Sequence, residues 1–190
     1  MSDTRTKILE LADGLFRSRG YTGFSYRDIA MQLGVKTAAI HYHFPGKADL
    51  GIAVIDRFRD LLKRRTGRFM GEGGDALIQL EAYFRFNQRQ CADACVTICP
   101  LGSVATAYET MPDAMRERAA LLLKETLAWL QRVLEVGREQ GVFHFAGDPR
   151  SRAVAVMATL QGALQLARVS ERAVLDTAIA QIRSDLAMTA

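Results

Sequence analysis

Three cysteines and three histidines are among the side chains of this sequence that could bind a metal or act as nucleophiles. Cys91, Cys95 and Cys99 are spaced at i, i+4 and i+8, which would place them on one face of a helix. Pro100 and the β-branched residues of "VTI" instead favour an irregular segment. Three thiolates can bind zinc, but no histidine or fourth cysteine lies nearby in the sequence, so we expect no metal site here.

A reactive thiol is the second possibility for this segment. Reactivity requires a lowered thiol pKa, which helix N-termini and nearby cations provide. Cys99 directly precedes Pro100, at a sequence compatible with a helix start, and Arg89 lies close to Cys91. The alternative is that these cysteines are buried, unreactive small side chains. Their odd number argues against a disulfide framework.

The histidines do not form a catalytic or metal-binding pattern. His41 and His43 are two residues apart and would point to different sides of a helix. His144 lies between Phe143 and Phe145 and suits packing better than base catalysis. We find no Ser-His-Asp order with a supporting motif and no glycine-rich phosphate loop. We therefore expect neither an enzyme nor a cofactor, with an all-helical enzyme or carrier as the alternative class.

The histidine pair belongs to the stretch "YRDIAMQLGVKTAAIHYHFPGK", residues 26–47, which predicts two short helices joined by a tight turn. Ser25 begins the first as an N-cap of the capping-box type. That helix ends at Gly34, where the turn is expected to need a positive φ. Thr37 can cap the second, which ends at Pro45-Gly46. An earlier helix precedes them, with one buried stripe formed by Ile8, Leu11, Ala12, Leu15 and Phe16.

The second short helix has the properties that groove reading requires. It is too short to be stable alone and carries few apolar residues. Its small first residues would let its N-terminal end approach base edges. The rings of His41, Tyr42 and His43 suit phosphate oxygens at the groove wall. Lys47 opposes the dipole of the next helix, which a phosphate bound at that helix start would explain.

Positive charge is concentrated in the same part of the sequence. Residues 1–70 contain 13 lysines and arginines and 7 acidic residues, a net charge of +6. Residues 71–190 contain 12 and 14, a net charge of −2. This asymmetry indicates that only the first part meets a polyanion, although a solvated basic face would give the same counts.

Residues 5–50 resemble the N-terminal domain of the TetR family of transcriptional repressors, through "ILELADGLFRSRGY", "SYRDIAMQLGV" and "HYHFPGKADL". His41 stands where the family usually has tyrosine. The resemblance implies that the start of the second short helix contacts bases. It also implies that the start of the first short helix, and the residues from His41 to Lys47, contact the DNA backbone. The implied DNA-binding residues are Ser25, Tyr26, Arg27, Lys36, Thr37, Ala38, Ala39, His41, Tyr42, His43 and Lys47. The implied core residues are Phe16, Ile29, Val35, Ile40 and Phe44.

The remaining sequence predicts further helices and no strand, so we expect an all-α protein of about nine helices. We place a DNA-binding domain at residues 1–46 and a helical effector-binding and dimerisation domain at residues 47–190. "GEGG" at 71–74 breaks a long helix, and "VATAYE" is expected to form a short one. A long helix is expected from Pro112-Asp113, with later helices starting at Pro149 and capped by Ser170.

A homodimer is expected because one short recognition helix supplies few base contacts. In the family the last two helices form a four-helix bundle with a second copy. The expected dimer stripes are Ala153, Val156, Leu160, Ala163 and Ala167, and Val174, Ala178 and Ile182. The alternative is that these stripes close the core of the single chain.

The central helices are expected to enclose a small-molecule effector, which the sequence does not identify. The candidate ligand-binding residues are Tyr83, Asn87, Cys99, Tyr108, Trp129, Met157 and Gln161. The segment "CPLGSVATAYE" also resembles that of family members that sense reactive electrophiles with a cysteine at this place, which makes Cys99 a candidate sensor. A DNA-binding protein without ligand control is the alternative.

We expect the protein to be cytoplasmic. No run of 18 apolar residues is present, and the first residues lack the apolar stretch of a signal peptide.

Overall fold

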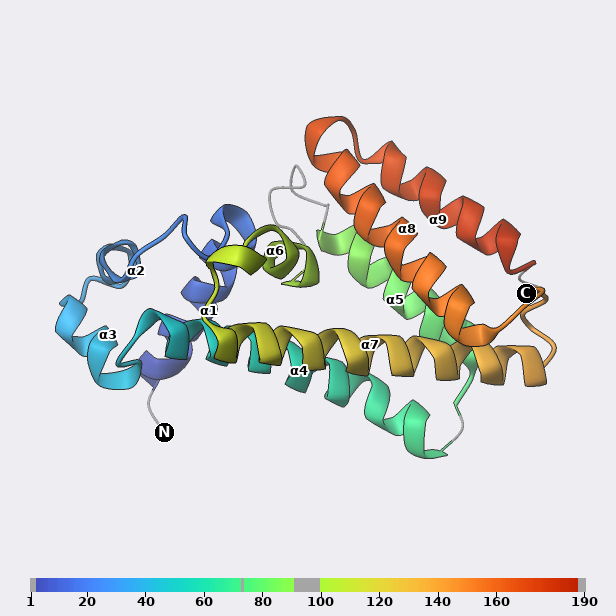
Figure 1. Cartoon of the computed structure of the whole chain (residues 1–190), viewed down its shortest axis with the longest axis horizontal. Helices are drawn as coiled ribbons and strands as arrows, with labels where there is room; N and C mark the ends of the chain where they lie inside the picture. Colours follow the sequence, from blue (N-terminus) through green and yellow to red (C-terminus); the bar gives the residue numbers. More distant parts are fainter. Residues whose placement is uncertain (1–2, 73, 91–99, 188–190) are drawn as a thin grey trace. The chain divides into compact units, whose positions relative to one another are not determined.

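The computed structural model describes residues 3–72, 74–90 and 100–187, and in these ranges the chain is helical and contains no strand (Figure 1). The predicted all-α class and the nine helices are confirmed. The helices are α1 (Asp3–Arg19), α2 (Tyr26–Leu33), α3 (Thr37–His43), α4 (Lys47–Glu72), α5 (Ala76–Gln90), α6 (Pro100–Thr106), α7 (Asp113–Glu139), α8 (Pro149–Val169) and α9 (Ala173–Asp185), with a 3-10 turn, η1 (Tyr108–Thr110).

Several helix ends follow the signals in the sequence. Gly34 ends α2 with φ 66°, a left-handed conformation that glycine adopts without a steric penalty. Asp148 caps α8, and its carboxylate accepts from the Ser151 amide at 2.9 Å. Pro149 then occupies the first turn, where a missing amide hydrogen costs nothing.

Three predicted boundaries differ from the structure. The short helix expected at "VATAYE" begins earlier, at Pro100, because proline is favoured in a first helical turn. Lys36, not Thr37, is the N-cap residue of α3. Ser170 does not cap α9; its hydroxyl donates to the Leu166 carbonyl at 2.8 Å and thereby ends α8.

The described residues form two compact units, each built from two stretches of sequence. The first contains Met1–Asp60 and Pro100–Leu122, and the second contains Leu61–Cys99 and Leu123–Ala190. The proposed DNA-binding domain, residues 1–46, lies within the first unit.

The first unit is built on α1, which packs against α2, α3 and α6. Apolar side chains from four helices form its core; Ile8, Phe16, Ile29, Ile40 and Leu50 are fully buried. Helix α4 also approaches the start of α7 closely, since a Cβ at Gly51 would overlap the Met115 side chain. Of the five residues assigned only to the core, four are buried and Val35 is half-buried.

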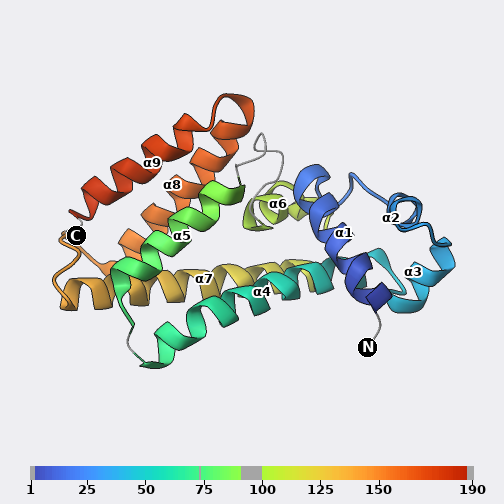
Figure 2. The ribbon, with the colours of Figure 1, turned by 180° about the vertical axis from the view of Figure 1, so that it is seen from behind.

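The second unit is centred on the later part of α7 together with α5, α8 and α9. Helices α8 and α9 lie side by side, as Figures 1 and 2 both show. Arg183 of α9 forms two hydrogen bonds of 2.7 Å with the carboxylate of Glu81 on α5. After α7 the chain turns back, and the Phe143 ring fills the position that a Cβ at Gly137 would occupy.

The α8 stripe predicted for the dimer does not lie on the surface of the chain, whereas the α9 stripe is only partly buried. Ala153, Val156, Leu160, Ala163 and Ala167 are at most 4% exposed, because α8 turns this face inward within the single chain. On α9, Ile182 is buried and Val174 and Ala178 are half-buried. A period of 3.6 residues shows that a face is buried but not which chain covers it.

Candidate nucleic-acid interface

The start of helix α2 is fixed by Ser25 and Asp28. The Ser25 amide and hydroxyl both donate to Asp28 Oδ2, at 2.7 and 2.6 Å. These hydrogen bonds hold the pKa of the Asp28 carboxyl below its usual value. Ser25 and the neighbouring Arg27 are exposed, so both remain accessible to a partner.

The turn between α2 and α3 brings the next candidate residues to the surface. The Val35 amide donates to the Ala30 carbonyl at 3.1 Å, which reverses the chain directly after Gly34. Lys36, Thr37 and Ala38 are exposed, whereas Ala39 is half-buried. Ile40 is the residue through which α3 enters the core.

Tyr26 has a structural role that differs from its predicted contact with the DNA backbone. Its side chain is buried, and its hydroxyl donates to the carbonyl oxygen of Phe44 at 2.8 Å. Burial raises the pKa of Tyr26 to about 12, with a smaller contribution from Asp49. Tyr26 therefore fixes the end of α3 from inside the unit instead of offering its hydroxyl to a ligand.

The polar rings at the end of α3 are exposed to different degrees. Tyr42 is 84% exposed, and its ring meets His43 edge-on with 5.1 Å between centroids. His41 packs edge-on against Tyr26 at 4.7 Å, and its Nδ1 lies 3.2 Å from the Pro45 carbonyl oxygen. His41 is thus an exposed ring held in a defined orientation.

Lys47 is more enclosed than the sequence suggests. Its ammonium donates to the Phe24 carbonyl oxygen and lies over the rings of Tyr21 and Phe24, at 4.9 and 4.7 Å from their centroids. Burial lowers the pKa of Lys47, and the nearby Asp28 opposes this. A phosphate at this helix start would share the ammonium with these internal partners.

Arg5 is a cation at this surface that the motif did not identify. Its guanidinium lies 5.0 Å from the centroid of the Phe44 ring, at the end of α3. The only signal in the sequence was the general excess of basic residues before residue 70.

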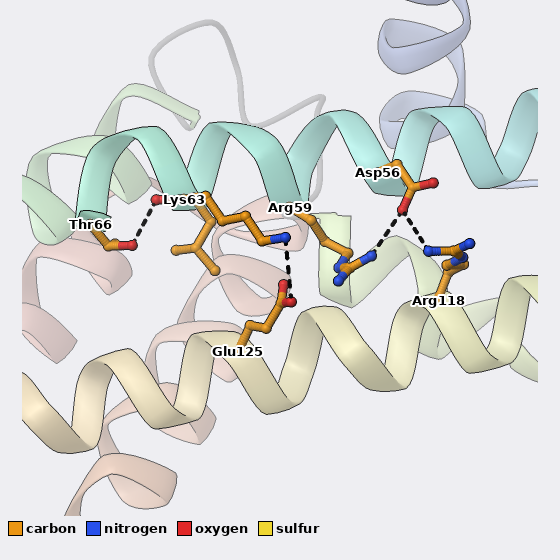
Figure 3. A network of polar contacts seen from close by, with 7 residues as sticks. Asp56, Arg59, Lys63, Thr66, Arg118 and Glu125 are labelled. Atoms are coloured by element: carbon orange, nitrogen blue, oxygen red, sulfur yellow. Dashed lines mark hydrogen bonds and ion pairs between the residues drawn. The ribbon is translucent and has the colours of Figure 1, made fainter. Parts of the chain in front are cut away.

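Ion pairs tie helix α4 to its neighbours. In the first unit Arg57 lies 3.4 Å from Glu10 of α1. Asp56 pairs with Arg59 of the same helix at 3.1 Å and with Arg118 of α7 at 3.6 Å (Figure 3). In the second unit Lys63 lies 3.8 Å from Glu125 of α7, as the same figure shows. These pairs are at least partly exposed, and such pairs contribute little to the stability of the fold.

The candidate ligand-binding residues are divided between the two units. Tyr108 belongs to the first unit and is 47% exposed, whereas Tyr83, Asn87, Trp129, Met157 and Gln161 belong to the second. Trp129 is 4% exposed, meets Tyr83 edge-on at 5.2 Å, and its indole nitrogen has no hydrogen-bond acceptor among the residues described. Cys91, Cys95 and Cys99 lie outside the described residues.

Comparison with known proteins identifies the two parts of the chain. Residues 8–54 match the family model described as "Bacterial regulatory proteins, tetR family". Residues 77–182 match "Tetracyclin repressor-like, C-terminal domain". The chain belongs to the TetR family. It is therefore a helix-turn-helix transcriptional regulator, and the expectation that it is not an enzyme is confirmed.

Individual relatives agree over the whole chain. The HTH-type transcriptional repressor NemR of Escherichia coli is 26% identical over 195 aligned positions, which cover 99% of this chain and 96% of NemR. A TetR-family regulator from Agrobacterium tumefaciens superposes with a TM-score of 0.88 at 29% identity, covering 98% of this chain and 97% of the other. The reduced form of E. coli NemR has the same fold, with a TM-score of 0.82, 24% identity and coverage of 99% and 100%.

None of the helices in the described part of the chain is long and apolar enough to cross a membrane.

Proposed function

We propose that this regulator represses transcription by binding a palindromic operator as a homodimer, and that a small molecule or thiol modification releases it. The observation that carries the DNA-binding part is helix α3 itself. It is seven residues long, is anchored from beneath by Ile40 and Tyr26, and leaves Lys36, Thr37 and Tyr42 exposed. A short helix that buries one side and exposes uncommitted polar groups on the other fits the major groove.

The proposed DNA contacts have distinct tasks. Lys36, Thr37, Ala38 and Ala39 would face base edges, and the small alanines would let the backbone approach the groove. The remaining proposed residues, which would hold the phosphate backbone, are Ser25, Arg27, His41, Tyr42, His43 and Lys47. Arg5 joins this group because its guanidinium lies beside the end of α3.

The dimer is proposed through the exposed faces of α8 and α9. No charged residue occurs between Arg152 and Arg168 of α8, and this stretch exposes Val154, Gly162 and Leu166. A long helical face that is exposed yet uncharged suits contact with a second copy. The inward stripe described above belongs to the core of the single chain.

The effector is proposed to bind in the second unit, near Trp129. An indole N–H buried without an acceptor costs free energy, and a ligand carrying a carbonyl or ether oxygen would satisfy it. Tyr83 holds the indole edge-on, and Asn87 is 1% exposed. Trp129 is the only tryptophan of the chain, so its fluorescence reports ligand binding directly.

Thiol modification is proposed at Cys99, on the sequence grounds given above. It is supported by the similarity to E. coli NemR, for which a form named as reduced is known. Treatment with N-ethylmaleimide should release the native chain from DNA and leave a Cys99→Ser variant bound.

The proposed function is tested by duplex binding at two salt concentrations. The native chain should select a palindromic duplex from a random pool, with an affinity that falls steeply as salt rises. Tyr42→Ala should weaken this binding, while the fold is retained because the Tyr42 side chain is mostly solvent-exposed. Selection of no sequence above the random pool would contradict the proposal.

A further inference from the structure

The start of helix α3 carries one long polar side chain, that of Lys36. Lys36, Thr37 and Ala38 are exposed there, and Ala39 is half-buried. Lys36 is the N-cap residue of α3, but its side chain makes no capping hydrogen bond, and the first turn of the helix has no acidic residue. In the described part of the chain the Lys36 ammonium has no hydrogen bond or ion pair. It can therefore bind a partner without losing an internal contact.

An ammonium group restricts which base it can read. It has three hydrogen-bond donors and no acceptor. In the major groove guanine presents two acceptors, N7 and O6, whereas adenine places an amino donor beside N7 and cytosine presents an amino donor. Thymine has one acceptor, O4, beside its methyl group. A side chain that only donates is thus satisfied most completely by guanine.

The neighbours of Lys36 do not duplicate this selectivity. The Ala38 side chain has no polar atom, and the Thr37 hydroxyl both donates and accepts, so it can serve more than one base. Because both side chains are short, the start of α3 can approach the base edges closely. The four-carbon stem of Lys36 then places its ammonium within reach of a base.

Other cations near α3 lie at different places. Arg27 belongs to α2, and the first helix of a helix-turn-helix crosses the DNA backbone instead of entering the groove. Arg5 lies over the Phe44 ring, at the opposite end of α3. The Lys47 ammonium donates to an internal carbonyl oxygen. Lys36 is therefore the cation at the end of α3 that is proposed to face the bases.

We propose that Lys36 selects one guanine in each half-site of the operator by donating hydrogen bonds to the guanine N7 and O6 atoms. This inference rests on the proposed DNA-binding function and names a base that the operator must contain. Because the proposed regulator is a homodimer, the two guanines lie at positions related by the symmetry of the palindrome. A lysine bound to a phosphate would instead add affinity without selecting any base.

The test measures base selectivity on a palindromic duplex that the native full-length chain has selected from a random pool. Each G·C pair is replaced in turn by A·T in both half-sites, and affinity is measured at one salt concentration. At one position the native chain should bind the altered duplex at least about tenfold more weakly. Lys36→Met keeps an unbranched side chain but has no ammonium, so it should bind the original and the altered duplex equally. The ratio of the two affinities cancels any general loss of binding in the variant.

Arg27→Met is the matched control, because it removes a cation from another exposed position of the same motif. It should weaken binding to every duplex by a similar factor and keep the guanine selectivity. Since Lys36 and Arg27 are both exposed, both variants should retain the helical signal of the native chain.

Modified bases test which guanine atoms are read. The analogue 7-deazaguanine lacks N7, so it should weaken binding of the native chain but not of Lys36→Met. Hypoxanthine keeps N7 and O6 but lacks the amino group that guanine presents in the minor groove, so it should bind like guanine. Weaker binding to hypoxanthine would place the reading side chain in the minor groove and contradict the inference.

Three further results would overturn it. Guanine selectivity that is kept in Lys36→Met, with all duplexes weakened alike, would make Lys36 a phosphate contact. Selectivity that is lost in Arg27→Met and kept in Lys36→Met would assign the reading to Arg27. An operator that requires no guanine would refute the inference and leave DNA binding intact, whereas failure to select any duplex would remove the proposed function as well.

Discussion

Removing the hydroxyl group of Tyr26 tests how much its hydrogen bond stabilises helices α2 and α3, independently of any contact with DNA. In Tyr26→Phe the ring stays in place, but the buried carbonyl of Phe44 loses the donor that lies 2.8 Å away. A buried acceptor left without its partner costs about 1–3 kcal/mol. For a chain of this length each kcal/mol lowers the midpoint of thermal unfolding by about 2–4 °C, so the midpoint should fall by several degrees.

Tyr42→Phe is the matched control, because it deletes the same atom from an exposed ring of the same short helix. Tyr42 is 84% exposed, and no hydrogen bond from its hydroxyl occurs among the described residues. This variant should unfold like the native chain but bind the operator more weakly, because the proposed phosphate contact loses its donor. Both variants are compared at one protein concentration, since the unfolding midpoint of the proposed dimer would depend on it.

Two outcomes would refute this reasoning. Equal unfolding midpoints for Tyr26→Phe and the native chain would mean that the bond to Phe44 contributes nothing to the folded state. A Tyr42→Phe variant that unfolds as early as Tyr26→Phe would mean that Tyr42 is also part of the packed structure.

Three further predictions concern other parts of the molecule. Because the pKa of Tyr26 is raised from 10 to about 12, its contribution to the free energy of unfolding should be complete below pH 10 and lost as pH rises toward 12. Denaturant titrations should show this loss in the native chain but not in Tyr26→Phe. Gly137→Ala should lower the free energy of unfolding by about 1–3 kcal/mol, because its Cβ would overlap the Phe143 ring. Gly67→Ala, whose Cβ would meet open space, should instead raise the free energy of unfolding by up to about 1 kcal/mol. If the proposed dimer forms through α8, Leu166→Lys should convert it to monomers in light scattering without loss of helical signal. Leu123→Lys on α7 should leave it intact, and equal effects of both would place the interface elsewhere.

Local signals in the sequence predicted the helix-turn-helix well. The hydrogen bonds of Ser25 with Asp28 involve residues three apart, and the positive φ of Gly34 is a property of glycine itself. Interactions of this kind involve residues within a few positions of one another, so they can be predicted from the sequence alone.

Long-range contacts were not predictable in the same way. Tyr26 and Lys47 each donate a hydrogen bond to a backbone carbonyl oxygen, 18 and 23 residues away in the sequence. Every residue has such a carbonyl, so the sequence does not indicate which one is the partner. The inward face of α8 illustrates a second limit. Hydrophobic spacing predicted that Val156 and Leu160 are buried, and they are buried within the single chain without a second copy.

The first compact unit has a consequence for synthesis on the ribosome. It needs both Met1–Asp60 and Pro100–Leu122, including the contact of Gly51 with Met115 and the ion pair of Asp56 with Arg118. The two stretches are separated by 39 residues of the other unit. Chains fold from the N-terminus as they emerge, but here the first helices cannot complete their packing until residue 122 has left the exit tunnel. Helices α1 to α3 of the nascent chain therefore keep part of their apolar surface exposed until Pro100–Leu122 has been synthesised.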